Sequence, residues 1–246
     1  MISNDDLVDD VERRAPSYLG GGQRDPEVLG ALRRVDRRLF LPAAAAAEAD
    51  ADRALPIGRG QTCSEPSMVA FMLDLLEIEA DQTLLEIGSG SGYAAAAAAL
   101  LAGPRGRVIA CEALPSLAAA MRANLERWRD GLRERAEAGR RAADWAAPIE
   151  IVVADGSLGF PARAPFDRIL LSAGVNRSAR GTGRAGREPA GRGFSERPLL
   201  AQLADGGILL YPETLGELLR VRKRGAALER DAWTGVAFVP LRGKNA

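Results

Sequence analysis

Apolar and polar positions change their spacing along the chain at about Gln82. Beyond it, short apolar runs bounded by polar residues predict strands, and longer runs with helical spacing predict the helices between them. The predicted strands are Thr83–Ile87, Arg107–Glu112, Ile149–Ala154, Phe166–Ser172 and Gly207–Tyr211, with helices at Tyr93–Ala102 and Ser116–Trp128. Because strands that alternate with helices pair in parallel and are covered on both faces, the pattern predicts a doubly wound α/β fold with a mostly parallel sheet.

The first 81 residues have helical spacing instead. Asp25 and Pro26 are typical of an N-cap followed by proline at the first helical position. The helix that they open should bury Val28, Leu29, Leu32 and Val35. A second helix is expected from about Pro66 to Glu77, and its buried side should consist of Met68, Val69, Phe71, Met72, Leu75 and Leu76. We therefore expect a helical segment, residues 1–81, that covers a core of residues 82–246 in one compact unit.

The end of the chain and two inserts depart from this rhythm. Glu217–Lys223 and Gly235–Leu241 predict two closing strands, antiparallel and joined by a turn around Gly225. Residues 129–148 are charged and predict a solvated helical extension. Residues 176–197 are rich in glycine and carry six arginines against two glutamates. Because such a composition cannot bury a core, we expect a flexible loop there, at the edge of the sheet where the parallel strands end.

The composition narrows the chemistry. The chain has no histidine, which excludes Ser-His-Asp and Cys-His triads and every metal site with a histidine ligand, so no metal is expected. Two cysteines are too few for a disulfide framework, and the polar, acidic start is not a signal peptide. Lys and Arg balance Asp and Glu at 33 each, which favours neither nucleic acid nor a membrane surface as a partner. We expect a cytoplasmic monomer.

A glycine-rich turn follows the first strand of the core, in Leu84-Leu85-Glu86-Ile87-Gly88-Ser89-Gly90-Ser91-Gly92. Glycines allow the backbone to turn sharply and to approach a ligand at the start of the next helix. Glu112 ends the following strand, where its carboxylate would bind both hydroxyls of a ribose. Glu86 would repel a pyrophosphate, but it would favour a cofactor that carries a sulfonium and an ammonium group. The turn therefore resembles the first motif of class I S-adenosylmethionine methyltransferases and predicts a Rossmann-like fold.

Asp155 and Gly156 follow the third strand, at the position that such enzymes use to bind the adenine amino group. Each acid taken alone has a purely structural interpretation, as a strand-end charge or a turn former. Three acids at the carboxyl ends of successive strands favour ligand binding, because open α/β sheets bind ligands at that edge. The predicted cofactor residues are Glu86, Gly88, Ser89, Gly90, Gly92, Glu112, Asp155 and Gly156.

A wider resemblance covers about residues 25–241. Its most specific part, Gly60-Gln61-Thr62-Cys63-Ser64-Glu65-Pro66, precedes the glycine-rich turn, and Phe238-Val239-Pro240-Leu241 continues it near the end of the chain. In these segments the chain resembles the protein-L-isoaspartate O-methyltransferases. The resemblance implies that Ser64 is catalytic, that Gln61 and Thr62 shape the substrate pocket, and that residues 1–81 cover substrate and cofactor. It further implies a repair enzyme that methylates the free carboxylate of L-isoaspartyl residues in proteins or peptides.

Physical chemistry agrees with this resemblance. A carboxylate is already an anionic nucleophile at neutral pH, so a chain without histidine needs no general base for its methylation. Transfer from a sulfonium to a carboxylate removes both charges, and alignment and the exclusion of water should supply most of the rate. Ser64 would orient the carboxylate, and it would also serve as N-cap of the helix that opens at Glu65-Pro66.

Two departures from the family pattern leave the substrate open. Cys63 stands where the family usually has an aliphatic residue, and the short loop after the fourth strand is replaced by Ser172–Val175 and the Arg-rich insert. One alternative is a carboxyl methyltransferase that acts on an aspartate of a dedicated partner peptide. Another is an RNA-binding methyltransferase that uses the insert. The insert contains a single aromatic residue, Phe194, which is unfavourable for stacking on bases.

Overall fold

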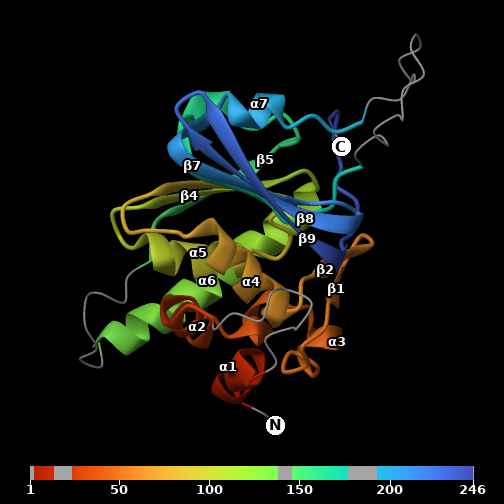
Figure 1. Cartoon of the computed structure of the whole chain (residues 1–246). Coiled ribbons are helices and arrows are strands. Elements are labelled where there is room, and N and C mark those ends of the chain that lie inside the picture. The colour runs from red at the N-terminus through yellow and green to blue at the C-terminus, as the bar shows by residue number, and fades with distance from the viewer. Residues whose placement is uncertain (1–2, 14–23, 138–145, 177–192, 246) are drawn as a thin grey trace.

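One sheet organises the computed structural model, which describes residues 3–13, 24–137, 146–176 and 193–245 (Figure 1). Its seven strands lie in the order β5-β4-β3-β6-β7-β8-β9. They are β3 (Thr83–Ile87), β4 (Arg107–Glu112), β5 (Ile149–Val153), β6 (Phe166–Leu171), β7 (Leu203–Pro212), β8 (Leu215–Arg224) and β9 (Ala227–Ala237). Strands β3 to β7 pair in parallel, whereas β8 and β9 pair antiparallel. The predicted α/β sheet with an antiparallel C-terminal edge is confirmed.

The two faces of the sheet have different covers. Successive side chains of β3 point to opposite faces, so Leu84 joins one hydrophobic cluster and Leu85 and Ile87 join the other. Helices α4 (Pro66–Leu76), α5 (Tyr93–Ala102) and α6 (Pro115–Glu137) lie on the first face, and the short helix α7 (Arg197–Leu200) lies on the other (Figure 1). The short helix η4 (Pro161–Arg163) precedes β6. Because α5 is almost all alanine, the backbones of its neighbours approach it closely.

The N-terminal segment packs on the helical face. It comprises α1 (Asn4–Arg13), α2 (Pro26–Arg33), η2 (Arg37–Phe40), α3 (Ala43–Ala46), β1 (Leu55–Gly58) and β2 (Gln61–Cys63). The predicted cap of α2 is confirmed, since Glu27 N donates to Asp25 Oδ1 at 2.8 Å, and Val28, Leu29, Leu32 and Val35 are all buried. Helix α4 is buried on more sides than predicted, because α1 and α2 pack on it from one side and β7 from another.

Several predicted boundaries were wrong. Strand β9 occupies Ala227–Ala237 rather than Gly235–Leu241, because a two-residue turn at Gly225 lets pairing resume at once between Arg224 and Ala227. Its exposed, charged side chains hid it from a search for apolar runs. Strand β7 begins at Leu203 rather than Gly207, and α6 continues to Glu137 rather than ending at Trp128. The remainder of the first insert, residues 138–145, and residues 177–192 of the second lie outside the described residues.

Candidate active site

The ends of four parallel strands meet at one edge of the sheet. Strand β3 leads into Gly88, β4 ends at Glu112, β5 leads to Asp155 and β6 leads to Ser172. The parallel register of these strands brings all four positions to the same side. The sequence predicted ligand binding at this edge, and the candidate site is built there.

The glycine turn, residues Gly88–Gly92, connects β3 to α5. Gly88, Gly90 and Gly92 have φ angles of 80°, 53° and 87°, a region that side chains with a Cβ rarely adopt. A Cβ on Gly92 would also lie 2.8 Å from Met121 Cγ. Gly88 N donates to the carbonyl of Cys111 at 2.8 Å, which ties the turn to the end of β4. The glycines thus let the turn adopt these φ angles and pack closely against Ala173, Ile57 and Met121.

Glu86 is the most unusual group at this edge. Its side chain is 1% exposed, and its Oε1 accepts a hydrogen bond of 2.6 Å from Ser172 Oγ. Its Oε2 is buried with no hydrogen-bond partner among the described residues. Burial raises the pKa of Glu86 to about 7. A buried oxygen without a donor fits a cationic group, so Glu86 and the glycine turn are compatible with the ammonium and sulfonium groups of S-adenosylmethionine.

Glu112, in contrast to Glu86, has a hydrogen-bond donor for each of its carboxylate oxygens. Its Oε2 accepts from Gly90 N at 3.0 Å and its Oε1 accepts from Leu114 N at 2.8 Å. These two amides fix the direction of the carboxylate at the end of β4. Each oxygen retains a second lone pair, so ribose hydroxyls remain possible ligands. The neighbouring thiol of Cys111 has its pKa raised to about 11 by burial, and it stays neutral at physiological pH.

Asp155 and Gly156 differ in their relation to the cavity, although they are adjacent in the sequence. Gly156 lines the cavity beside Cys111, and a Cβ there would lie 2.9 Å from the thiol sulfur. The exposed carboxylate of Asp155 accepts from Ser157 N at 3.0 Å and from Lys244 N at 2.8 Å. Asp155 thus contacts the C-terminal tail and does not line the cavity. Its role toward adenine stays a prediction.

The serine loop, residues Gln61–Ser64, faces the glycine turn. It is anchored by Arg37, whose side chain is fully buried in the turn after α2. The Arg37 guanidinium donates to the carbonyl of Cys63 at 3.3 Å and to that of Ser64 at 2.9 Å. It also donates to the carbonyls of Ala49, Ala51 and Arg53, which precede β1. One buried cation therefore joins the serine loop to the segment before the β1–β2 hairpin through backbone oxygens alone.

The predicted capping role of Ser64 was wrong. The N-cap residue of α4 is Glu65, and its side chain makes no capping hydrogen bond. Ser67 N, in the first turn, donates to Asp52 Oδ1 at 2.9 Å. An acid that is distant in sequence thus takes over the cap, because the Arg37 contacts hold the Ser64 backbone outside the helix. The Ser64 hydroxyl makes no hydrogen bond with any described residue, so it is free to bind a ligand.

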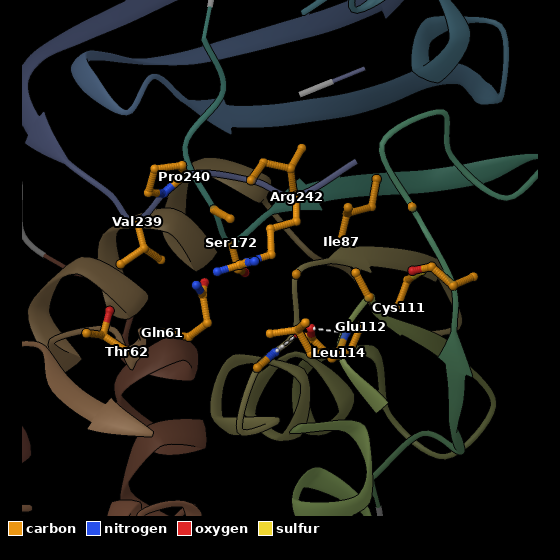
Figure 2. A pocket seen from close by; sticks show the side chains of 17 residues that line it. Gln61, Thr62, Ile87, Cys111, Glu112, Leu114, Ser172, Val239, Pro240 and Arg242 are labelled. Atoms are coloured by element: carbon orange, nitrogen blue, oxygen red, sulfur yellow. Dashed lines mark hydrogen bonds between the residues drawn. The ribbon is translucent and has the colours of Figure 1, made fainter. Parts of the chain in front are cut away.

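Two adjoining cavities lie between the turn and the loop, and they share four wall residues, Thr62, Gly88, Gly90 and Ser172. The first cavity, shown in Figure 2, contains Glu112, Leu114 and Gly156, with Gln61 and the tail on its other walls. The second contains Ser64 and Glu86 together with Ser89. Of the predicted site residues, only Asp155 and Gly92 line neither cavity; Gly92 instead caps α5.

Several site residues were missed by the sequence analysis. Ser172 follows β6, so the strand-end argument that found Glu112 would also have found it. Val239–Arg242 lie along the edge because Gly174 N donates to Val239 O and Leu241 N donates to Gly174 O, at 2.8 and 2.7 Å. Nothing local in the sequence indicates that the tail returns to the site. Nor does any motif indicate that Arg37 is buried.

The structure bears on the RNA-binding alternative and on a membrane partner. The ring of Phe194, the single aromatic residue of the second insert, packs against Tyr211 with centroids 5.1 Å apart. Its ring is therefore committed to the protein and not presented for stacking on bases. Among the helices of the described residues, none combines the length and the apolar character needed to cross a membrane.

Comparison with known proteins adds independent support. Residues 18–180 match the sequence model of the family described as protein-L-isoaspartate(D-aspartate) O-methyltransferase. The chain is 40% identical over 223 residues to the protein-L-isoaspartate O-methyltransferase of Methanococcoides burtonii, which covers 89% of this chain and 94% of the relative. It is 39% identical over 238 residues to that of Anaeromyxobacter dehalogenans, covering 94% and 97%.

Solved structures share the fold. A putative protein-L-isoaspartate O-methyltransferase from Plasmodium falciparum, in complex with S-adenosyl-L-homocysteine, superposes with a TM-score of 0.71 over 98% of both chains at 20% identity. Another protein-L-isoaspartate O-methyltransferase gives the same TM-score over 97% of this chain and 67% of its own. With the match over most of its length and close relatives across nearly all of it, this chain belongs to the protein-L-isoaspartate O-methyltransferase family.

Proposed function

We propose that this protein transfers the methyl group of S-adenosylmethionine to the free carboxylate of L-isoaspartyl residues in damaged proteins or peptides. The observation that carries the proposal is the second cavity. Glu86, whose buried oxygen has no donor, and Ser64, whose hydroxyl is free, both line it. One group suits a cation and the other suits a carboxylate. Family membership supports the same pairing of ligands.

In this proposal, the chain binds and aligns two charged reactants. When bound, S-adenosylmethionine supplies an electrophilic methyl group on a sulfonium sulfur. Glu86 balances the positive charge at that end, and the two backbone amides that hold Glu112 direct its carboxylate toward the ribose. Ser64 donates its hydroxyl hydrogen to the isoaspartyl carboxylate or to the adjacent carbonyl and orients it. The acceptor oxygen gains the methyl group as the carbon–sulfur bond breaks, and both products are left neutral at the reacting atoms.

No residue of the site needs to remove a proton. The acceptor carboxylate is ionised at neutral pH, and the nearby Cys111 thiol is held neutral by its raised pKa. Glu86 and Ser89 are buried in the wall of the second cavity, which the bound reactants would fill. Excluding water removes the hydration of two charges that the reaction neutralises, which favours the transfer.

The surroundings of the reaction are part of the same proposal. We propose a monomer that acts in the cytoplasm on isoaspartyl proteins or peptides. The two buried cysteines, Cys63 and Cys111, are not joined in a disulfide, which agrees with a reducing compartment. Size-exclusion chromatography with light scattering checks the monomer, and a second peak at twice the mass would contradict it.

One assay tests the function. Methyl transfer from labelled cofactor is measured on an isoaspartyl peptide and on its normal aspartyl twin of identical sequence. We expect the isoaspartyl peptide alone to be labelled, and the label to be released by mild base as expected for an ester. Equal labelling of both peptides, or labelling of the aspartyl twin alone, would overturn the repair function and favour an aspartate of a dedicated partner peptide.

A further inference from the structure

Arg242 is a cation of the candidate site. Neither the predicted cofactor nor the reacting carboxylate is expected to bind it. It lies in the wall of the first cavity, and its side chain is exposed. Figure 2 shows it reaching from the tail across the cavity toward Gln61 on the opposite wall. Within the described part of the chain its guanidinium makes no hydrogen bond or ion pair. Glu112, in the wall of the same cavity, has both carboxylate oxygens on backbone amides instead.

The backbone around Arg242 is held on both sides. Before it, Leu241 N donates to Gly174 O at 2.7 Å. After it, Lys244 N donates to Asp155 Oδ2 at 2.8 Å and Asn245 N donates to Ser157 Oγ at 3.0 Å. These anchors attach the tail to the ends of β6 and β5, with Arg242 between them. The position of Arg242 over the cavity is therefore set by the fold and not by a local side-chain contact.

The two cavities divide the possible anions between them. The cofactor's amino-acid end belongs in the second cavity, with its ammonium group, and not its carboxylate, toward the unpartnered oxygen of Glu86. The reacting carboxylate belongs beside Ser64 in the same cavity. Arg242 lines only the first cavity, where the cofactor would place its uncharged adenosine. An anion for Arg242 must therefore come from another part of the substrate.

We propose that Arg242 binds the carboxylate of an acidic residue that flanks the isoaspartate, and so makes acidic peptides the preferred substrates. The inference rests on the proposed function. Gln61, opposite Arg242, is three residues from Ser64 along an extended segment, a span of roughly 10 Å. An extended peptide covers that distance in two or three residues. The preferred acid is accordingly two or three positions from the isoaspartate.

Peptide kinetics test the proposal. Each isoaspartyl peptide carries Glu, Gln or Lys two or three positions from the isoaspartate, on either side. The kcat/KM of each peptide is measured with the wild type, Arg242→Gln and Arg242→Lys. We expect the Glu peptide to be preferred in at least one series. Arg242→Gln should lower kcat/KM for that peptide about 10-fold, through KM, while the Gln peptide changes little. Arg242→Lys should retain most of the preference, and salt should weaken it.

Arg105→Gln is the matched control. Arg105 is also exposed, but it pairs with Asp81 at the opposite edge of the sheet, so the variant has the same net charge without touching the site. Its peptide ranking should equal that of the wild type. Calorimetric titration of the cofactor should give one dissociation constant for all four proteins. Weaker cofactor binding by Arg242→Gln with an unchanged peptide ranking would overturn the proposal and make Arg242 a cofactor ligand.

The same experiments distinguish a failure of the proposed function from a failure of this inference. If the wild type methylates none of the peptides, the proposed function fails. Titration of the peptides with S-adenosyl-L-homocysteine present then still measures whether Arg242 favours the Glu peptide. If all peptides are methylated and the Arg242→Gln ranking matches the wild type, the function stands and the role of Arg242 is refuted.

Discussion

The glycine turn and the serine loop face each other across the same two cavities, yet the fold holds them differently. The turn is part of the sheet edge, and its amides bond to Cys111 O and Glu112 within the neighbouring strand. The serine loop pairs only with β1, and this pairing ends at Cys63, one residue before Ser64. It depends on Arg37, a buried cation from a distant turn, that binds the carbonyls of Cys63 and Ser64.

This difference explains which groups remain available for ligands. In both regions the backbone is satisfied internally, and selected side-chain atoms are not. The Oε2 of Glu86 and the hydroxyl of Ser64 have no partner among the described residues, although each lies beside a well-bonded backbone. Because the Glu86 oxygen is buried, leaving it unsatisfied costs free energy in the absence of a ligand. We infer that both atoms are held ready by structure that is stable without them.

The largest expected effect is on the serine loop. Replacing Arg37 by Met leaves five carbonyl oxygens, two of them fully buried, without their donor, and we expect the free energy of unfolding to fall by about 3–5 kcal/mol. Chemical denaturation measures it. Arg53→Met is the control, because its exposed side chain pairs with Glu48 and should cost less than about 1 kcal/mol. Equal losses in the two variants would refute the anchoring role of Arg37.

Removal of the Ser64 hydroxyl should have a smaller effect, on activity rather than stability. We expect Ser64→Ala to lower kcat about 100-fold through lost orientation, with cofactor affinity unchanged. Because Glu65 and not Ser64 is the N-cap of α4, the unfolding midpoint should stay at the wild-type value. A stability loss of about 1 kcal/mol, typical of a deleted cap, together with full activity would reverse the two roles.

On the side of the glycine turn, the expected effect depends on pH. A cation binds the ionised form of Glu86, whose pKa is raised to about 7 by burial. Cofactor affinity should therefore fall toward 10-fold per pH unit as pH drops below 7, and stay constant above it. Glu86→Gln should bind more weakly and lose this dependence. Glu112→Gln, which leaves Glu86 in place, should bind the cofactor more weakly and keep the pH dependence. Calorimetric titration of the cofactor from pH 5.5 to 8 distinguishes the two variants.

The same ionisation predicts a pH-dependent change in the stability of the protein without cofactor. Between its ordinary pKa of about 4.5 and about 7, Glu86 keeps its proton in the folded state and loses it on unfolding. Folding is favoured by the protonated form, so this contribution to stability is present below pH 4.5 and is lost as pH rises through 7. Glu86→Gln should flatten the stability profile over this interval. An unchanged slope in the variant would contradict the raised pKa.

The amino-acid sequence by itself determined the fold and most of the site. Apolar runs located β3 to β6 almost to the residue, because the central strands β3, β4 and β6 are buried on both faces and must be almost continuously apolar. Glycines in Gly88–Gly92 and acids at the ends of β3 and β4 located one side of the two cavities, because parallel strands end at one edge. The serine loop was found through its resemblance to a family. Each of these signals is local, within a few residues of the group that it identifies.

Only the tertiary structure decided the remainder, because the partners are far apart in the sequence. Asp52 caps α4 across 15 residues in place of Ser64, and Arg37 reaches the serine loop across 27. Asp155 turns to Lys244 in the tail, 89 residues away, while the same tail brings Arg242 over the cavity. Whether a polar group is satisfied depends on what the folded chain places beside it. Local patterns can therefore locate a functional group, but they do not determine which of its atoms remain free.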